Sequence, residues 1–193
     1  NRIWEGTNEI NRQIISGYMM KKVLTEEISL RDFLKDLNTF IAADVQANSH
    51  DNFAIEKHAV QATKKLAVLI FQEALCEFGQ DLKHEQQLSE AFADIFTHIY
   101  TSESVICRVQ QTLSSNGTSN MPVNIAKINV AESLLEVRSL SAKCLNRIFS
   151  ENVPTSIMRS VTKLHDIINL DTDTISLKKD LGEFMIDRKD YPF

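Results

Sequence analysis

The feature that most constrains this fold is a run of apolar side chains that recur in alternating steps of four and three residues. Its members are Leu88, Phe92, Ile95, Ile99, Ser102, Ile106, Val109 and Leu113, so Ser102 is the single polar interruption. A repeat of 3.5 residues places all of them on one face of a helix from about Glu85 to Leu113. Such helices cross their neighbours at about +20°, as in four-helix bundles. We therefore predict an all-α fold, an up-and-down bundle of about four main helices with short flanking helices.

Helical periodicity continues on the N-terminal side of this run. Thr7 is a plausible N-cap for a helix over about residues 8–24, whose apolar side holds Ile10, Ile14, Ile15 and Tyr18. Ser29 is expected to cap a second helix, because Leu30, Leu34, Leu37 and Ile41 share one face. A third helix is predicted over about 53–79. Its middle, Leu66–Phe71, is apolar all round, which indicates a central, buried helix.

The C-terminal half is also predicted to be helical. After a polar loop at Ser114–Asn120, Pro122 suits the first turn of a helix that runs to about Phe149. Two apolar stripes on it indicate two neighbours: Val130, Leu134, Val137, Cys144 and Ile148, and Ile128, Ala131, Leu135, Ala142 and Phe149. A shorter helix should open at Pro154, with Ile157, Val161, Leu164 and Ile168 on one face. A last one carries Leu177, Leu181 and Phe184.

Composition narrows the classes of function. Glycine and proline number only 5 and 3 in 193 residues, which favours long helices with few loops. The formal net charge of −5 disfavours nucleic acid as a partner, because such binding needs a basic surface. No apolar run approaches the 18 residues or so of a transmembrane helix, and no secretory signal is visible.

Cysteine and histidine patterns give no metal or redox site. Cys76, Cys107 and Cys144 are far apart and form no Cys-x-x-Cys pair. Each falls in an apolar helical pattern, so we expect reduced, buried thiols in a cytosol-like compartment. Three further residues, Glu90, Asp94 and His98, stand four apart on one helix and could share a cation. A solvated helix face is the favoured interpretation, and no metal site is predicted.

The first fifteen residues carry the one candidate for chemistry. Glu5 follows an aromatic residue, and Gly6 allows close approach of the backbone to a ligand. The free N–H groups of a helix that opens at Thr7 suit polar or anionic ligand atoms. Burial beside an apolar wall would raise the pKa of Glu5 toward that of a general base. The alternative from the residues alone is an ordinary capped helix start with a solvent-facing Glu5.

This segment, RIWEGTNEINRQII, resembles the C-terminal signature of the acyl-CoA dehydrogenases, Glu-Gly-Thr-x-x-Ile-x-Arg preceded by Arg-Ile-Trp. The resemblance implies that Glu5 is the base that removes the α-proton of an acyl-CoA thioester while a hydride leaves to FAD. It implies that Gly6 lies against the substrate thioester. It also implies that the cofactor-binding residues are Thr7, Asn8, Glu9 and Arg12, the last supporting the helix and its flavin-side contacts.

The motif covers only about residues 1–24, which the resemblance assigns to the last helix of the catalytic region. Residues 25–193 are then an additional C-terminal helical bundle domain, as in relatives that resemble the very-long-chain type. The chain begins at Asn1 without an initiator Met, so we expect the C-terminal piece of a longer protein, inactive alone.

The resemblance also implies a setting, which is fatty-acid β-oxidation with electron-transfer flavoprotein as acceptor. A homo-oligomer, with a dimer favoured, and a bacterial cytoplasmic location are expected. The alternative is the mitochondrial matrix or peripheral inner membrane if the source is eukaryotic. A function of another class stays open at this stage: a helical docking domain for oligomerisation, a membrane surface or a partner, or an assembly role without turnover.

Overall fold

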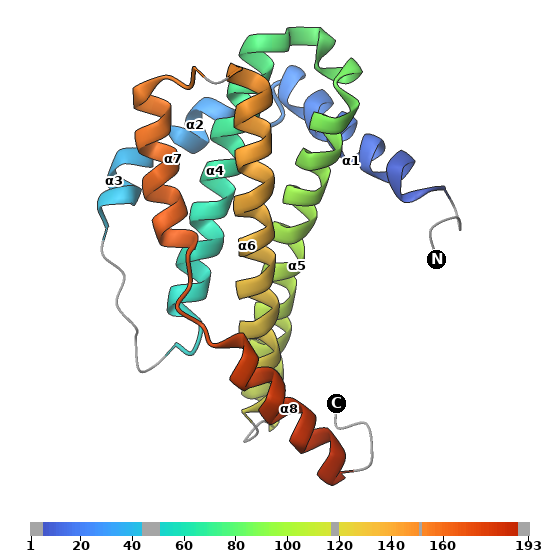
Figure 1. The fold of residues 1–193 in the computed structure, drawn as a ribbon, viewed down its shortest axis with the longest axis vertical. Coiled ribbons are helices and arrows are strands. Elements are labelled where there is room, and N and C mark those ends of the chain that lie inside the picture. Colours follow the sequence, from blue (N-terminus) through green and yellow to red (C-terminus); the bar gives the residue numbers. More distant parts are fainter. Residues whose placement is uncertain (1–5, 44–50, 117–119, 151, 189–193) are drawn as a thin grey trace.

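The structure is a computed structural model that describes residues 6–43, 51–116, 120–150 and 152–188. Every regular element within these ranges is a helix, so the predicted all-α class is confirmed. Four helices form the bundle: α4 (Ala54–Phe78), α5 (Gln86–Asn116), α6 (Met121–Phe149) and α7 (Thr155–Ile168). They run up and down along the long axis of the molecule (Figure 1). The four main helices therefore agree with the prediction from sequence.

α4 is the central helix, in contact with α5, α6 and α7. Five of the six residues from Leu66 to Phe71 are buried, as the apolar sequence indicates, and Val68 is half-buried. The Phe71 ring meets the ring of Phe92 on α5 edge to face, with centroids 4.9 Å apart. At its C-terminus, Gly79 takes φ +54°, a conformation that glycine adopts readily, and its N–H bonds to Leu75 O. The short 3₁₀ helix η1 (Gly79–His84) then leads into α5.

The heptad face of α5 is confirmed. Leu88, Phe92, Ile95, Ile99, Ile106 and Val109 are all buried, and Leu113 is half-buried. Ser102 is fully buried too, and its Oγ has no hydrogen-bond partner among the described residues. The helix continues to Asn116, so the polar loop that was expected from Ser114 begins later. Ser114 Oγ donates to Gln110 O over 2.9 Å, which satisfies this hydroxyl within the helix.

The single helix predicted after Ser29 is wrong, because two short helices occupy this stretch. Ser29 does cap α2 (Leu30–Leu34), but the helix is interrupted at Lys35 and Asp36 before α3 (Leu37–Ala42) begins. Lys65 of α4, 7% exposed, donates from Nζ to Phe33 O over 3.1 Å and to Asp36 Oδ1 over 2.6 Å. In an unbroken helix that carbonyl would accept from the N–H of Leu37. The break therefore lets backbone and carboxylate oxygens satisfy a buried ammonium.

α6 confirms one of its two predicted stripes. Val130, Leu134, Val137, Cys144 and Ile148 are all buried. In the second stripe only Ile128 is buried, whereas Leu135 is 62% exposed and Ala142 is exposed. The small side chains of Ala126, Ser133 and Ser141 are buried instead. Small residues let neighbouring helices approach closely. A prediction based on apolar residues does not count serine, so it missed Ser133 and Ser141 as contact residues.

α7 and α8 (Thr174–Arg188) complete the fold. On α7, Val161, Leu164 and Ile168 are buried as predicted, and Ile157 is half-buried. α8 lies against α6 at the lower end of Figure 1, and Leu177, Leu181 and Phe184 are half-buried. No described helix combines the length and the hydropathy that a bilayer crossing would need.

The prediction of three buried thiols is wrong for two of them. Cys144 is buried, and desolvation raises its pKa to about 12. Cys76 and Cys107 are exposed. Both lie on long helices, next to the stripe of buried side chains. The apolar pattern alone does not show how far the contact with neighbouring helices extends around each helix.

Candidate functional site

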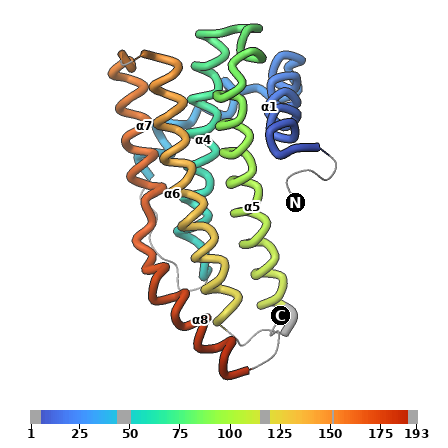
Figure 2. The backbone as a smooth tube through the Cα atoms, turned by 45° about the vertical axis from the view of Figure 1, so that its right-hand side comes forward, coloured from blue at the N-terminus to red at the C-terminus, as the bar shows by residue number. Residues whose placement is uncertain are grey.

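The described part of the signature, from Gly6 onward, leads into α1 (Asn8–Leu24), which packs on α5. In Figure 2, α1 stands beside α5 at the edge of the bundle. Figure 1 shows its N-terminal end directed away from the four main helices. The candidate site is therefore on the surface, at the outer end of a helix held by α5.

The first turn of α1 is well defined. Thr7 has extended backbone dihedrals, and its Oγ1 accepts from Ile10 N over 3.3 Å, so the predicted N-cap is confirmed. Gly6 has φ +109°, a conformation that residues with a side chain rarely adopt. A Cβ at this position would also lie 3.1 Å from Asn11 Oδ1. Glycine thus allows the chain to turn into the helix without strain.

The predicted site residues divide into three groups. Glu5 lies outside the described residues. Gly6, Thr7, Asn8 and Glu9 are adjacent and exposed at the outer end of α1. Arg12 is half-buried and faces α5 instead. The roles predicted for all six residues remain predictions.

Arg12 is bound by two carboxylates of α5. Its Nε donates to Asp94 Oδ1 over 2.6 Å, and its Nη1 lies 3.1 Å from Glu90 Oε1. The hydrogen bond to Asp94 is the main cause that raises the pKa of Arg12 above its usual value. Glu90 and Asp94 are thus committed to an arginine. Among the described residues no group of three or more His, Cys, Asp or Glu side chains could hold a metal ion.

Sequence reasoning did not find these two partners of Arg12. Their spacing of four residues was visible and indicates a shared helix face. The pattern does not say which other helix that face meets. Only the packing of α1 on α5 brings Arg12 to them.

The side of α1 that meets the bundle changes character along the helix. Its N-terminal half is polar: besides Arg12, Gln13 Nε2 donates to Gln86 O over 3.0 Å, and Ser16 is 5% exposed. Its C-terminal half packs Met20 and Val23 against the core. The apolar side that sequence analysis identified is turned away from the bundle. Its members are 37–63% exposed: Ile10, Ile14, Ile15 and Tyr18.

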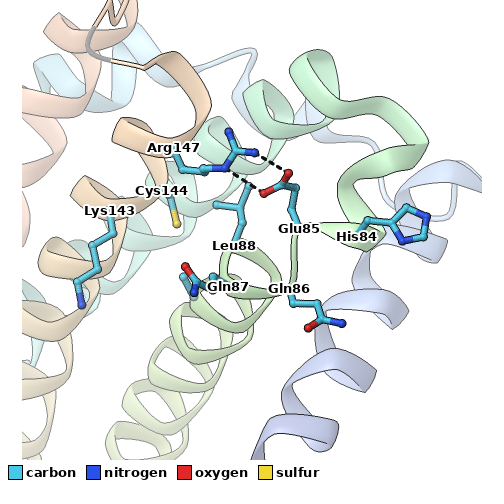
Figure 3. Close-up of a pocket in the computed structure, with 9 residues that line it drawn as sticks. His84, Glu85, Gln86, Gln87, Leu88, Lys143, Cys144 and Arg147 are labelled. Atoms are coloured by element: carbon cyan, nitrogen blue, oxygen red, sulfur yellow. Dashed lines mark hydrogen bonds and ion pairs between the residues drawn. The ribbon is translucent and has the colours of Figure 1, made fainter.

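A pocket of about 420 Å³ lies at the same end of the bundle, between the start of α5 and the end of α6. In Figure 3, Leu88 and Cys144 approach each other from the two helices, and Arg147 reaches across to Glu85. This ion pair is bidentate, with N–O distances of 2.6 and 3.0 Å. Since its guanidinium is held by Glu85 and stacks 4.8 Å from the Phe78 ring centroid, Arg147 fastens the α4–α5 connection to α6.

Two histidines, His58 and His165, pack within the bundle. His58 stacks on Phe40 with centroids 4.7 Å apart, and desolvation lowers its pKa. His165 Nε2 lies 2.8 Å from Ser141 Oγ, which itself donates to Arg138 O. This hydroxyl thus links α6 to α7 at His165. Burial and the nearby Arg138 lower the pKa of His165.

Comparison with known proteins gives concordant matches. A family model described as acyl-CoA dehydrogenase, C-terminal domain, matches residues 62–163, which lie in the bundle and not in the Glu-Gly-Thr motif. A probable acyl-CoA dehydrogenase of Bacillus subtilis (strain 168) is 28% identical over 148 residues, 75% of this chain and 25% of that protein.

A solved structure, an acyl-CoA dehydrogenase from Bacillus anthracis complexed with FAD, superposes with a TM-score of 0.85 at 22% identity. The superposition covers 100% of this chain and 32% of that one. This chain therefore spans about a quarter to a third of the length of these relatives. The match to more than half of its residues shows that the chain belongs to the acyl-CoA dehydrogenase family, as a C-terminal domain.

Proposed function

We propose that this chain is the C-terminal part of an FAD-dependent acyl-CoA dehydrogenase that converts an acyl-CoA to the trans-2-enoyl-CoA in fatty-acid β-oxidation. The observation that carries the proposal is the placement of the described part of the motif. Gly6 and Thr7 lead into α1 at the edge of the bundle, where residues 6–11 are exposed. The family match in the bundle supports it independently of the motif. A docking domain without catalysis is not favoured by that match.

The exposed apolar side of α1 supports the proposed division of the chain. Ile10, Ile14 and Tyr18 are 55–63% exposed on one side of a helix whose other side already contacts α5. Uncovered apolar faces mark contacts with other protein surfaces. We assign residues 1–24 to the last helix of a catalytic region that covers this face. Residues 25–193 form the additional bundle domain.

The residues present fit one edge of a flavin site. Thr7 and Asn8 offer a hydroxyl and an amide on an exposed helix start, and the N–H groups of a first turn suit polar ligand atoms. FAD, when bound, supplies the acceptor for the hydride that leaves the β-carbon of the substrate. Glu9 and Arg12 complete the proposed set on the same helix. In the proposal, Arg12 acts from the side of α1 that faces the bundle.

Glu5 is the proposed general base. An α-proton of a thioester is weakly acidic, so its removal requires a desolvated carboxylate and stabilisation of the developing enolate oxygen. Gly6 leaves room for the thioester beside the base, because it carries no side chain. Glu5 would accept the α-proton as the hydride departs, which leaves the α,β double bond.

The chain alone is proposed to be inactive. Its candidate site residues come from one helix end, whereas a flavin and an acyl chain need enclosing walls on several sides. In the longer protein we propose electron-transfer flavoprotein as the acceptor and a homo-oligomer, with a dimer favoured. Longer acyl chains as substrates and a bacterial cytoplasmic location complete the proposal.

The test uses the protein of the full reading frame, purified with its flavin, and follows the visible flavin absorbance as saturated acyl-CoAs of increasing length are added. Wild type is expected to bleach, and Glu5→Gln is expected to bind the acyl-CoA but bleach at least about a hundredfold more slowly, since general-base catalysis contributes about 10²–10⁴-fold. The length that bleaches fastest defines the substrate class.

Two results would overturn parts of this proposal. A purified protein without flavin would remove the dehydrogenase function and leave the bundle as a docking domain. Bleaching at the wild-type rate in Glu5→Gln would remove Glu5 as the base while the flavoprotein function stands.

A further inference from the structure

The attachment of α1 to the bundle begins at Arg12. Counting from Gly6, every side chain through Asn11 is exposed, and Arg12 is the first that is half-buried. Its guanidinium reaches Asp94 over 2.6 Å and Glu90 over 3.1 Å. Gln13, which donates to Gln86 O, and the buried Ser16 follow along the same side.

This order matters because a helix is stiff. Arg12 stands four residues after Asn8, the first residue of α1, which is about 6 Å along the axis at 1.5 Å per residue, and Gly6 lies two residues before that start. Met20 and Val23 hold the C-terminal half of α1 on the core, and Arg12 is the contact nearest to the N-terminal end of the helix. A rotation of α1 that released Arg12 would therefore shift Gly6. Misplacement of a reacting group by about 1 Å can cost about a hundredfold in rate.

Arg12 can be held firmly because its partners are complementary in charge and partly shielded from water. The side chains of Arg12 and Asp94 are 30% and 28% exposed. Charge-assisted hydrogen bonds of this length are stronger than neutral ones and fix geometry through the planar guanidinium. Glu90 is more exposed, at 42%, and its contact is longer, so Asp94 is the principal partner.

We propose that Asp94, assisted by Glu90, is a positioning residue of the active site: it acts through Arg12 to orient the Glu5–Gly6 segment. This inference rests on the proposed dehydrogenase function. It assigns the bundle a role in catalysis, because a carboxylate of α5 then sets the alignment of the base with the α-carbon of the substrate.

The bundle offers a matched control. Glu85 also makes a charge-assisted pair with an arginine, Arg147, and its side chain is 28% exposed like that of Asp94. This pair joins α6 to the start of α5 and does not involve α1. Loss of bundle stability alone should therefore affect Asp94→Asn and Glu85→Gln alike, whereas loss of alignment should affect only the former.

The experiment compares wild type, Asp94→Asn, Asp94→Glu, Glu90→Gln and Glu85→Gln in the full-length, flavin-loaded protein. Flavin content, Tm, kcat, KM and the kinetic isotope effect with acyl-CoA deuterated at C2 are measured. We expect kcat to fall about tenfold or more in Asp94→Asn. KM should stay within about threefold, and the isotope effect should rise as proton removal becomes rate-limiting.

The remaining variants rank the contacts. Asp94→Glu is expected to recover most of kcat, Glu90→Gln to lose less than Asp94→Asn, and Glu85→Gln to keep the wild-type value. A kcat of Asp94→Asn within twofold of wild type, or an equal loss in Glu85→Gln, would overturn the positioning role. Failure of wild-type protein to be reduced by any acyl-CoA would instead overturn the proposed function.

Discussion

α7, one of the four bundle helices, and α1, which packs on α5, have similar lengths, yet they bury their apolar side chains to different extents. α7 has 14 residues and buries Val161, Leu164 and Ile168 against its neighbours. α1 has 17 residues and packs only Met20 and Val23 on the core beside the polar contacts of Arg12, Gln13 and Ser16, while Ile10, Ile14, Ile15 and Tyr18 are exposed. α7 therefore buries most of its apolar side chains within this chain, with Met158 exposed. α1 retains an unused apolar face, which is the physical basis for assigning it to a second surface.

The largest effect should come from removing an apolar contact of α7. Leu164 is fully buried, so Leu164→Ala should lower the free energy of unfolding by about 2–5 kcal/mol through lost transfer energy and a cavity. Urea denaturation of the 193-residue chain measures it. A loss below about 1 kcal/mol would show that α7 is not an integral part of the core and would weaken the contrast with α1.

A smaller effect is expected where α1 meets α5. Ser16 is 5% exposed, and Ser16→Leu would place a large side chain in a contact fitted to a small one. Overpacking of this kind costs about 1–3 kcal/mol. Amide hydrogen exchange should show loss of protection in α1 while α7 keeps its own. Equal loss in both helices would mean that they open as one unit.

The stability of α7 in the bundle should depend on pH, whereas the ion pairs that hold α1 on α5 should not. The pKa of His165 on α7 is lowered by burial and by Arg138, so the folded state prefers the neutral imidazole. Its contribution to stability is present above the unfolded pKa of about 6.5 and is lost as pH falls through the folded pKa. Arg12 stays charged throughout this range, since its pKa is raised.

Hydrogen exchange between pH 7.5 and 5 tests this difference. After correction for the intrinsic rate, protection of α7 should decline, and His165→Gln should make that decline shallower. In the turn of α1 that contains Arg12, hydrogen-exchange protection is expected to show no pH dependence caused by Arg12. A decline of the same size in His165→Gln would assign the pH response to another group, with His58 the next candidate because its pKa is also lowered.

The smallest effect is expected on the outer side of α1. Ile14 is 63% exposed, so Ile14→Ala should change the free energy of unfolding of this chain by no more than about 0.5 kcal/mol. In the full-length protein the same substitution should cost about 2–5 kcal/mol if the face is covered there. Equal, negligible costs in both would leave the apolar face of α1 without a partner.

Much of the bundle follows directly from local sequence. The 3.5-residue repeat of α5 specifies one buried face, because side chains at that spacing line up on a helix whatever surrounds it. Leu66–Phe71 indicated the central helix, since an element that is apolar all round must be enclosed. Pro122 and Thr7 indicated two helix starts, because capping chemistry acts within one turn.

The predictions from sequence were wrong where contacts between residues distant in sequence determine the local structure. One amphipathic stripe predicted a single helix over residues 30–41, but Lys65, distant in sequence, takes the carbonyl of Phe33 at a break. The second stripe predicted on α6 included Leu135 as a contact residue, but Leu135 is exposed and the serines Ser133 and Ser141 are buried. In both cases a polar side chain lies in a contact between helices, where a pattern of apolar residues does not register it.

By itself the sequence determined the helical class, the buried faces of α4, α5 and α7, and the motif that indicates acyl-CoA chemistry. Each depends on the identity and spacing of residues within a few turns. Tertiary structure alone decided which side of α1 faces the bundle and which carboxylates hold Arg12. α1 carries apolar residues on both sides, and its docked side is the one on which Arg12 meets Asp94 and Glu90 of α5 while Met20 and Val23 reach the core.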